Sequence, residues 1–221
     1  MTVQVELHCL IGIVGYSPVV DAYPLGVRLM QGLENRIATH PGVRIENMTW
    51  GPIHIVQHFQ DENGPRPHRI VLVGAAPHSV QPGTVTAYRW IGGKLPEIVL
   101  QERVYEAVTG IVDIDNTLAI GEHFGIWPAE VYAVEIDLPV NCFGDIVIAD
   151  SERRSTDDEL AVVLGFSPTA AITALVDTSA ALALSGGDPG MALATKAATP
   201  LSRGASFMRT TFADKKGHCD D

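Results

Sequence analysis

An apolar run that passes through a glycine-containing loop into an amphipathic helix constrains the fold of this chain more than any other segment. Residues 7–14 are mainly apolar, and the loop that follows contains Gly15 and a single acid, Asp21. Apolar residues then recur at every fourth position, at Leu25, Leu29, Leu33 and Ile37. This spacing predicts a helix over residues 24–38, because residues four apart lie on the same side of a helix. The run therefore predicts a strand, a loop and a helix that packs back onto a sheet.

Strand and helix patterns continue to alternate along the rest of the chain. Ser167 before Pro168 is a typical helix start, since serine caps free backbone N–H groups and proline fits the first turn. The prediction is one α/β domain over residues 1–186, a three-layer sandwich with a mixed, mostly parallel sheet, followed by an irregular or mobile C-terminal tail over residues 187–221. Further strands are predicted at residues 43–48, 69–76, 85–91 (as an edge strand) and 131–139, and further helices at 52–60, 113–125 and 168–184.

Charge and hydropathy argue against several classes of partner. The formal net charge is -11 and the isoelectric point is near 5.1, whereas binding to a phosphate backbone needs clustered lysine and arginine. No apolar stretch reaches the length of a membrane span, and the first residues lack the basic and apolar parts of a signal peptide. Cys9, Cys142 and Cys219 form no C-x-x-C pair, so neither a zinc knuckle nor a disulfide framework is indicated. We therefore expect a cytoplasmic protein that binds neither nucleic acid nor membranes.

Several short segments share their order and spacing with one known family. The segments are the loop at 15–21, Gly-Val-Arg-Leu-Met-Gln-Gly-Leu-Glu at 26–34, Ile-Val-Leu-Val-Gly-Ala-Ala at 70–76, Pro-Gly-Thr-Val at 82–85, residues 115–136 with a Gly-Ile-Trp-Pro turn, and Gly-Phe-Ser-Pro-Thr at 165–169. Together they resemble the hydrogenase maturation proteases over residues 10–184. The resemblance implies the phosphorylase/hydrolase-like fold of that family and, as partner, the large subunit of a [NiFe]-hydrogenase, whose C-terminal peptide the family removes.

The positions that hold nickel in that family carry no metal ligand in this sequence. The family uses an acid after the first strand, an aspartate at the end of the third parallel strand and a histidine at the start of the next long helix, a ligand set that suits a divalent nickel ion. Those positions hold Ala22, Gly74 and Gly110. The family's Asp-Gly-Gly-Thr loop is also replaced, by Asn-Met-Thr-Trp at residues 47–50. The comparison implies a retained fold whose metal chemistry is lost or moved, and no cofactor is expected.

The leading functional hypothesis is a binding protein without peptidase activity. The former substrate cleft, formed by the loops around Asp21, Ala22, Trp50, Gly74 and Gly110, would bind a hydrogenase large subunit or one of its assembly factors. Loss of the metal ligands removes the guidance of cleavage and leaves the binding groove.

The alternative is an active endopeptidase with a relocated, nickel-binding site. His54 and His58 are four residues apart and share a helix face, a spacing that can chelate a metal. His78 follows the central strand and can approach the face where Asp21 lies. A displaced site of Asp21, His54 and His78 would then guide removal of the large subunit's C-terminal peptide. A third hypothesis is a small-molecule binder on the same fold.

Each candidate residue also has a purely structural interpretation. Asp21 can cap the helix that follows it, and the two histidines of residues 52–60 can be a solvated surface pair. Asp113 and Asp115 lie at a helix start, where negative charge is favoured by capping and by the helix dipole. Trp50 and Trp127 are either core residues or, if exposed, parts of a protein-binding surface.

Overall fold

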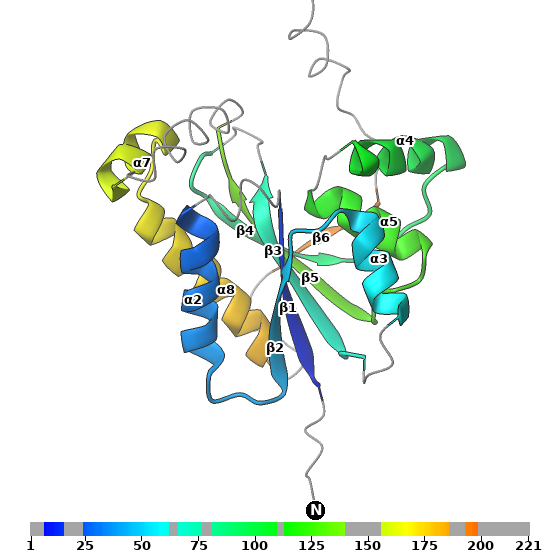
Figure 1. The fold of residues 1–221 in the computed structure, drawn as a ribbon, viewed down its shortest axis with the longest axis horizontal. Coiled ribbons are helices and arrows are strands. Elements are labelled where there is room, and N and C mark those ends of the chain that lie inside the picture. Colours follow the sequence, from blue (N-terminus) through cyan, green and yellow to red (C-terminus); the bar gives the residue numbers. More distant parts are fainter. Residues whose placement is uncertain are drawn as a thin grey trace, which may run out of the picture.

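The computed structural model describes residues 7–15, 24–61, 66–76, 81–109, 113–139, 156–185 and 193–198, with helices on both faces of a central sheet (Figure 1). The described strands lie in the order β2-β1-β3-β5-β4-β6. The strands are β1 (Cys9–Val14), β2 (Val43–Met48), β3 (Arg69–Ala76), β4 (Val85–Trp90), β5 (Glu130–Asp137) and β6 (Ala194–Lys196). The helices are α2 (Pro24–Ile37), α3 (Pro52–Asp61), α4 (Glu97–Val108), α5 (Ile114–His123), α7 (Asp157–Leu164) and α8 (Pro168–Leu184).

The sheet is mixed and mostly parallel. Strands β2, β1, β3 and β5 run in one direction, β4 is antiparallel to β5, and β6 is parallel to β4. Helices α2, α7 and α8 lie on one side of the sheet, and α3, α4 and α5 lie on the other (Figure 1). The predicted three-layer α/β class with a mixed sheet is therefore confirmed.

Each face of the sheet carries its own apolar core, because successive strand residues point to opposite faces. On β5, Tyr132 and Val134 join the core under α2 and α8, whereas Val131 and Ala133 join the core under α3 and α5. The alternation places Glu135 on the α5 face, where an apolar residue would be the ordinary choice. Glu135 is thus a polar residue at a strand position that faces an apolar core.

Arg69, the first residue of β3, holds the C-terminal end of α8. Its side chain is 2% exposed, and its guanidinium lies 2.6 Å from Glu130 Oε2. The same group donates hydrogen bonds to the carbonyl oxygens of Leu182, at 2.6 Å, and Ser185, and it lies 5.4 Å from the centroid of the Tyr132 ring. The last carbonyls of a helix lack partners within the helix, so Arg69 supplies the donors that this end of α8 needs.

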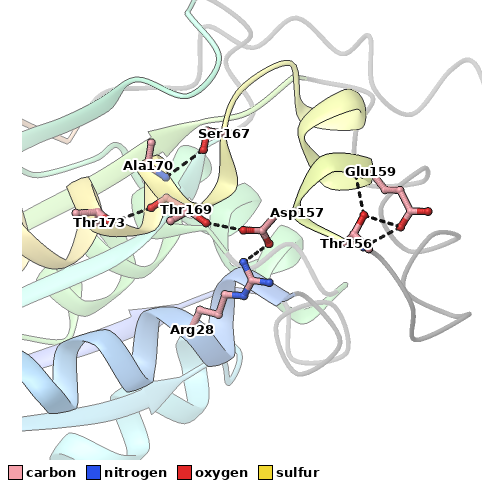
Figure 2. A network of polar contacts seen from close by, with 8 residues as sticks. All are labelled: Arg28, Thr156, Asp157, Glu159, Ser167, Thr169, Ala170 and Thr173. Carbon is pink, nitrogen blue, oxygen red and sulfur yellow. Dashed lines mark hydrogen bonds and ion pairs between the residues drawn. The ribbon is translucent and has the colours of Figure 1, made fainter.

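Helix α7 is tied to α2 and α8 by a polar network (Figure 2). Asp157 of α7 forms an ion pair with Arg28 of α2 and accepts a 2.5 Å hydrogen bond from Thr169 Oγ1 of α8. Thr156 and Glu159 form a capping box at the start of α7. The Arg28 and Asp157 side chains are 40% and 41% exposed, so the pair orients α7 and adds little stability.

Two helices and one strand lie where no such element was predicted. Residues 194–196, in the segment expected to be irregular, form β6 and pair with β4. The prediction that β4 is an edge strand is consequently wrong, because β6 covers its outer side. Helices α4 and α7 were also missed. The division of the chain at residue 186 stays a prediction.

Within the described ranges, no single helix has both the length and the hydropathy of a membrane span. Helices α7 and α8 meet that test only as a pair, and the pair is bent by 83°.

Candidate functional site

The carboxyl ends of β1 and β3 are the place where a ligand is expected in this topology. The chain leaves β1 through α2 over one face to reach β2, and it leaves β2 through α3 over the other face to reach β3. Neighbouring connections therefore diverge between β1 and β3, and open α/β sheets bind ligands at such a switch point. Of the residues predicted for this cleft, Trp50 and Gly74 are described. Asp21, Ala22, Gly110 and His78 lie outside the described residues.

Gly74 is tightly enclosed. It is buried on the α5 face of β3, and a Cβ atom added there would lie 2.9 Å from the Val14 carbonyl oxygen and 3.0 Å from Ile114 Cδ1. Real Cβ atoms essentially never make a backbone contact that short, so a side chain at this position requires the sheet or α5 to shift. The family's aspartate therefore does not fit here. At the three positions where the resemblance implies nickel ligands, Ala22, Gly74 and Gly110 carry no side-chain donor and so do not suit a nickel ion.

Trp50 presents a partly exposed aromatic ring at the carboxyl end of β2. The residue is 40% exposed, and its ring meets the His58 ring edge to face, with centroids 5.2 Å apart. His58 Nε2 lies 3.3 Å from Glu46 Oε2. Through these contacts, α3 and β2 together hold the tryptophan in place. Of its two interpretations, partial exposure favours a binding surface.

The displaced metal site stays a prediction. His54 is exposed in the first turn of α3, but Asp21 and His78 lie outside the described residues. His58, its partner on the helix face, is already engaged by Glu46 and Trp50. No group of three or more His, Cys, Asp or Glu side chains able to hold a metal occurs among the residues that the structure describes.

The two aspartates at the start of α5 differ in role. Asp113 Oδ1 accepts a 2.6 Å hydrogen bond from the backbone N–H of Asn116, which confirms it as the N-cap. Asp115 instead lies 2.6 Å from Lys196 Nζ of β6. Its structural interpretation as a simple helix-start charge is incomplete, because it links α5 to a strand far along the chain.

Asp115 belongs to a partly buried polar cluster that sequence reasoning missed. We name it the Glu135 cluster, and it comprises Tyr88, Asp115, Glu135 and Lys196. Lys196 Nζ lies 3.8 Å from Glu135 Oε2, donates to Tyr88 Oη at 3.4 Å and lies 4.6 Å from the centroid of the Tyr88 ring. The Tyr88 hydroxyl also hydrogen-bonds Glu135. The cluster spans β4, β5, β6 and α5, beside Gly74, which pairs with Glu135 across the strands.

Burial raises the pKa of two members of this cluster, Glu135 and Tyr88. Desolvation raises the pKa of the Glu135 carboxyl from 4.5 to about 7, against the opposing effect of the Lys196 charge. The carboxylates of Asp115 and Asp113 raise it further. Burial, with the nearby Glu135, also raises the pKa of Tyr88 above its ordinary range. Glu135 is therefore a group that can take up or release a proton near neutral pH.

The raised pKa of Glu135 gives a pH-dependent stability. As pH rises from about 4.5 to 7, the unfolded state releases this proton while the folded state keeps it, so the free energy of unfolding falls. Glutamine does not titrate. Between pH 5 and pH 8 we expect the stability of Glu135→Gln relative to the unsubstituted chain to shift by about 2 to 3 kcal/mol in favour of the variant. Urea unfolding at the two pH values measures the shift, and Glu102→Gln, an exposed change on α4, is the control. A relative stability that is the same at both pH values would contradict the raised pKa.

Comparison with known proteins gives no further assignment. No protein-family model matches the chain, and neither a curated protein nor a solved structure does. The class that the fold defines is an α/β protein with a mostly parallel mixed sheet, and function has to be argued from its residues.

Proposed function

We propose that this chain is a hydrogenase maturation protease-like protein without peptidase activity. It binds the large subunit of a [NiFe]-hydrogenase, or an assembly factor of that enzyme, at the carboxyl ends of β1 and β3. The observation that carries the loss of chemistry is the enclosure of Gly74 by the Val14 carbonyl and Ile114. This enclosure leaves no room for the ligand that the family places there. The choice of partner rests on the resemblance of segments 15–34, 70–85, 115–136 and 165–169.

The residues at the carboxyl ends of the parallel strands support a protein partner. Trp50 follows β2, the strand next to β1, and is 40% exposed. Aromatic side chains of this size supply much of the binding energy in protein interfaces, because they bury a large area with few rotatable bonds. An exposed ring, together with a Gly74 that leaves no room for the aspartate ligand, suits recognition better than cleavage.

We expect Trp50→Ala to weaken binding of the unprocessed large subunit about tenfold or more, as loss of an aromatic anchor does. Calorimetric titration of the full chain with the unprocessed subunit measures the change. Leu184→Ala is the matched control, because Leu184 is 38% exposed and lies at the end of α8 that Arg69 contacts from the amino end of β3, away from the carboxyl ends of the strands. Equal losses for the two variants would contradict a binding surface at Trp50. Cleavage of the subunit by the purified chain would overturn the non-catalytic assignment.

The alternative function, a metal-guided endopeptidase, draws support from the exposure of His54 in α3, which leaves this histidine accessible. It requires tight, stoichiometric Ni²⁺ binding by the chelator-treated chain that is lost in Asp21→Ala. It also requires processing of the large subunit in cells that Asp21→Ala abolishes. Binding of the subunit without either result separates the two functions in favour of recognition.

A further inference from the structure

Strand β6 joins the sheet by backbone pairing with β4. It has three residues, and the side chains of Ala194 and Thr195 are exposed. Pairing continues past its end, since the Ile91 N–H donates to the Lys196 carbonyl at 3.0 Å and the Ala198 N–H donates to the Gly92 carbonyl at 3.1 Å. Backbone pairing of this kind places few demands on the sequence of the added strand.

Lys196 is the residue of β6 whose side chain contacts charged and aromatic groups of other elements. Its ammonium lies 2.6 Å from Asp115 Oδ1 and 3.8 Å from Glu135 Oε2, and it rests 4.6 Å from the Tyr88 ring centroid. Two carboxyl groups and an aromatic face therefore converge on one cation. Because one ammonium can contact all three partners at once, these side chains favour a lysine at this place in the strand.

Two glycines after β4 allow the backbone of a neighbouring segment to approach closely. Beyond the strand, Gly92 and Gly93 have φ values of 71° and 137°, a region that other residues rarely adopt. A Cβ atom on Gly93 would lie 3.3 Å from Ala198 Cβ and 3.4 Å from Ala198 N. The glycines thus allow the segment after the lysine to approach closely, provided that it too carries a small side chain.

We propose that the outer edge of β4, with Tyr88, Asp115 and Glu135, is a binding site for an extended, lysine-bearing segment of a partner protein. Residues 194–198 occupy this site in the free chain as an exchangeable strand. The partner segment has a lysine followed by small residues, because Lys196 and Ala198 show which side chains the site accepts. This site goes beyond the proposed function, since it uses the β4 edge and not the crevice between β1 and β3.

A labelled peptide with the sequence of residues 191–199 tests the site in trans. The receptor is the full chain with Lys196→Met, in which the resident strand has lost its cation. By fluorescence anisotropy, we expect this chain to bind the lysine peptide about tenfold more tightly than the same peptide with methionine at the lysine position, as expected for loss of charge-assisted hydrogen bonds. Adding Asp115→Asn and Glu135→Gln to the receptor should abolish this preference. Equal binding of the two peptides would overturn the proposal.

Hydrogen exchange supplies a second measurement that also works on the unsubstituted chain. The Ile91 amide is protected by the Lys196 carbonyl, so Lys196→Met should speed its exchange and the lysine peptide should restore protection. If the variant fails to fold, an excess of peptide added to the unsubstituted chain must compete with β6 and shift the NMR signals of residues 88–93. The absence of such a shift would overturn the proposal. A dimer that forms by exchange of β6 and does not bind the peptide would also overturn the proposal, because the β4 edge would then bind a second copy of this chain.

Discussion

Replacing Arg69 by methionine is expected to lower the free energy of unfolding by about 3 to 5 kcal/mol, as when one partner of a buried ion pair is removed. The side chain is 2% exposed and pairs with Glu130. Its loss also removes the donor that Arg69 supplies to the Ser185 carbonyl oxygen, whereas the Leu182 carbonyl keeps a 3.0 Å hydrogen bond from Ser185 Oγ. The unpaired Ser185 carbonyl adds to the loss, since a buried acceptor without a partner costs about 1 to 3 kcal/mol. Methionine keeps most of the side-chain volume, so the measured loss reports the polar contacts rather than a cavity.

Urea unfolding followed by circular dichroism measures this effect, and Arg36→Met provides the comparison. Arg36 lies 3.1 Å from Asp177 between α2 and α8, but the two side chains are 59% and 54% exposed. Exposed pairs contribute at most about 1 kcal/mol. A loss at Arg69 no larger than that at Arg36 would mean that α8 does not depend on this contact.

Gly74→Asp, which introduces the aspartate that the hydrogenase maturation proteases carry where this chain resembles them, should destabilise the chain by about 3 kcal/mol or more, the range of buried unpaired charges and overpacked cores. The added Cβ would lie 2.9 Å from the Val14 carbonyl oxygen. The new carboxyl would also lie next to Glu135, the residue paired with Gly74 across the strands, whose pKa is already raised to about 7. Two neighbouring buried carboxyl groups cannot both ionise without a further penalty.

Two variants separate the causes of this effect. Gly74→Ala introduces the steric contact alone and should cost about 1 to 3 kcal/mol. Gly51→Asp places the same carboxyl at the start of α3, where the added Cβ meets nothing closer than the Ala107 carbonyl oxygen at 3.8 Å, and where Asp is a favoured cap. It should be neutral or stabilising. Thermal unfolding with and without Ni²⁺ completes the test. A Gly74→Asp chain as stable as the unsubstituted one, and stabilised by nickel, would contradict our account of the Gly74 environment.

Elements with strong local patterns could be predicted from the sequence. The bounds of β2 and β3 agree with the predicted residues 43–48 and 69–76. Helix α8 begins after Ser167, whose hydroxyl oxygen accepts the Ala170 N–H, as its Ser-Pro start indicated. In each case, a run of apolar residues or a capping residue lies within the element itself, so no knowledge of distant partners was needed.

The elements that were missed depend on contacts that the sequence does not display. Helix α4 buries Arg103 and Ala107, while Ile98, Tyr105 and Val108 are exposed, so its apolar residues do not mark an inner face. Strand β6 exists through its pairing with β4.

The sequence indicates one member of the Glu135 cluster, Glu135 itself, but not its partner Lys196. A glutamate on the inward-facing side of an apolar strand is a detectable departure, because buried carboxyl groups need partners. Its partner Lys196 comes from a segment without a recognisable pattern, so the pair itself could not be predicted. The identity of Gly74 could be read from the sequence, but its close contact with the Val14 carbonyl could not.

The two outer strands of the described sheet also bear on self-association. Exposed strand edges pair readily with other chains, and short strands or charged side chains discourage such pairing. At one edge, β2 carries Arg44 and Glu46, whose charged groups lie 2.7 Å apart. At the other edge, three residues of β6 with one lysine cover the six-residue strand β4. A chain that released β6 with no replacement would expose β4 as a template for aggregation. Strand β6 therefore prevents the β4 edges of different molecules from pairing with one another for as long as no other segment covers β4.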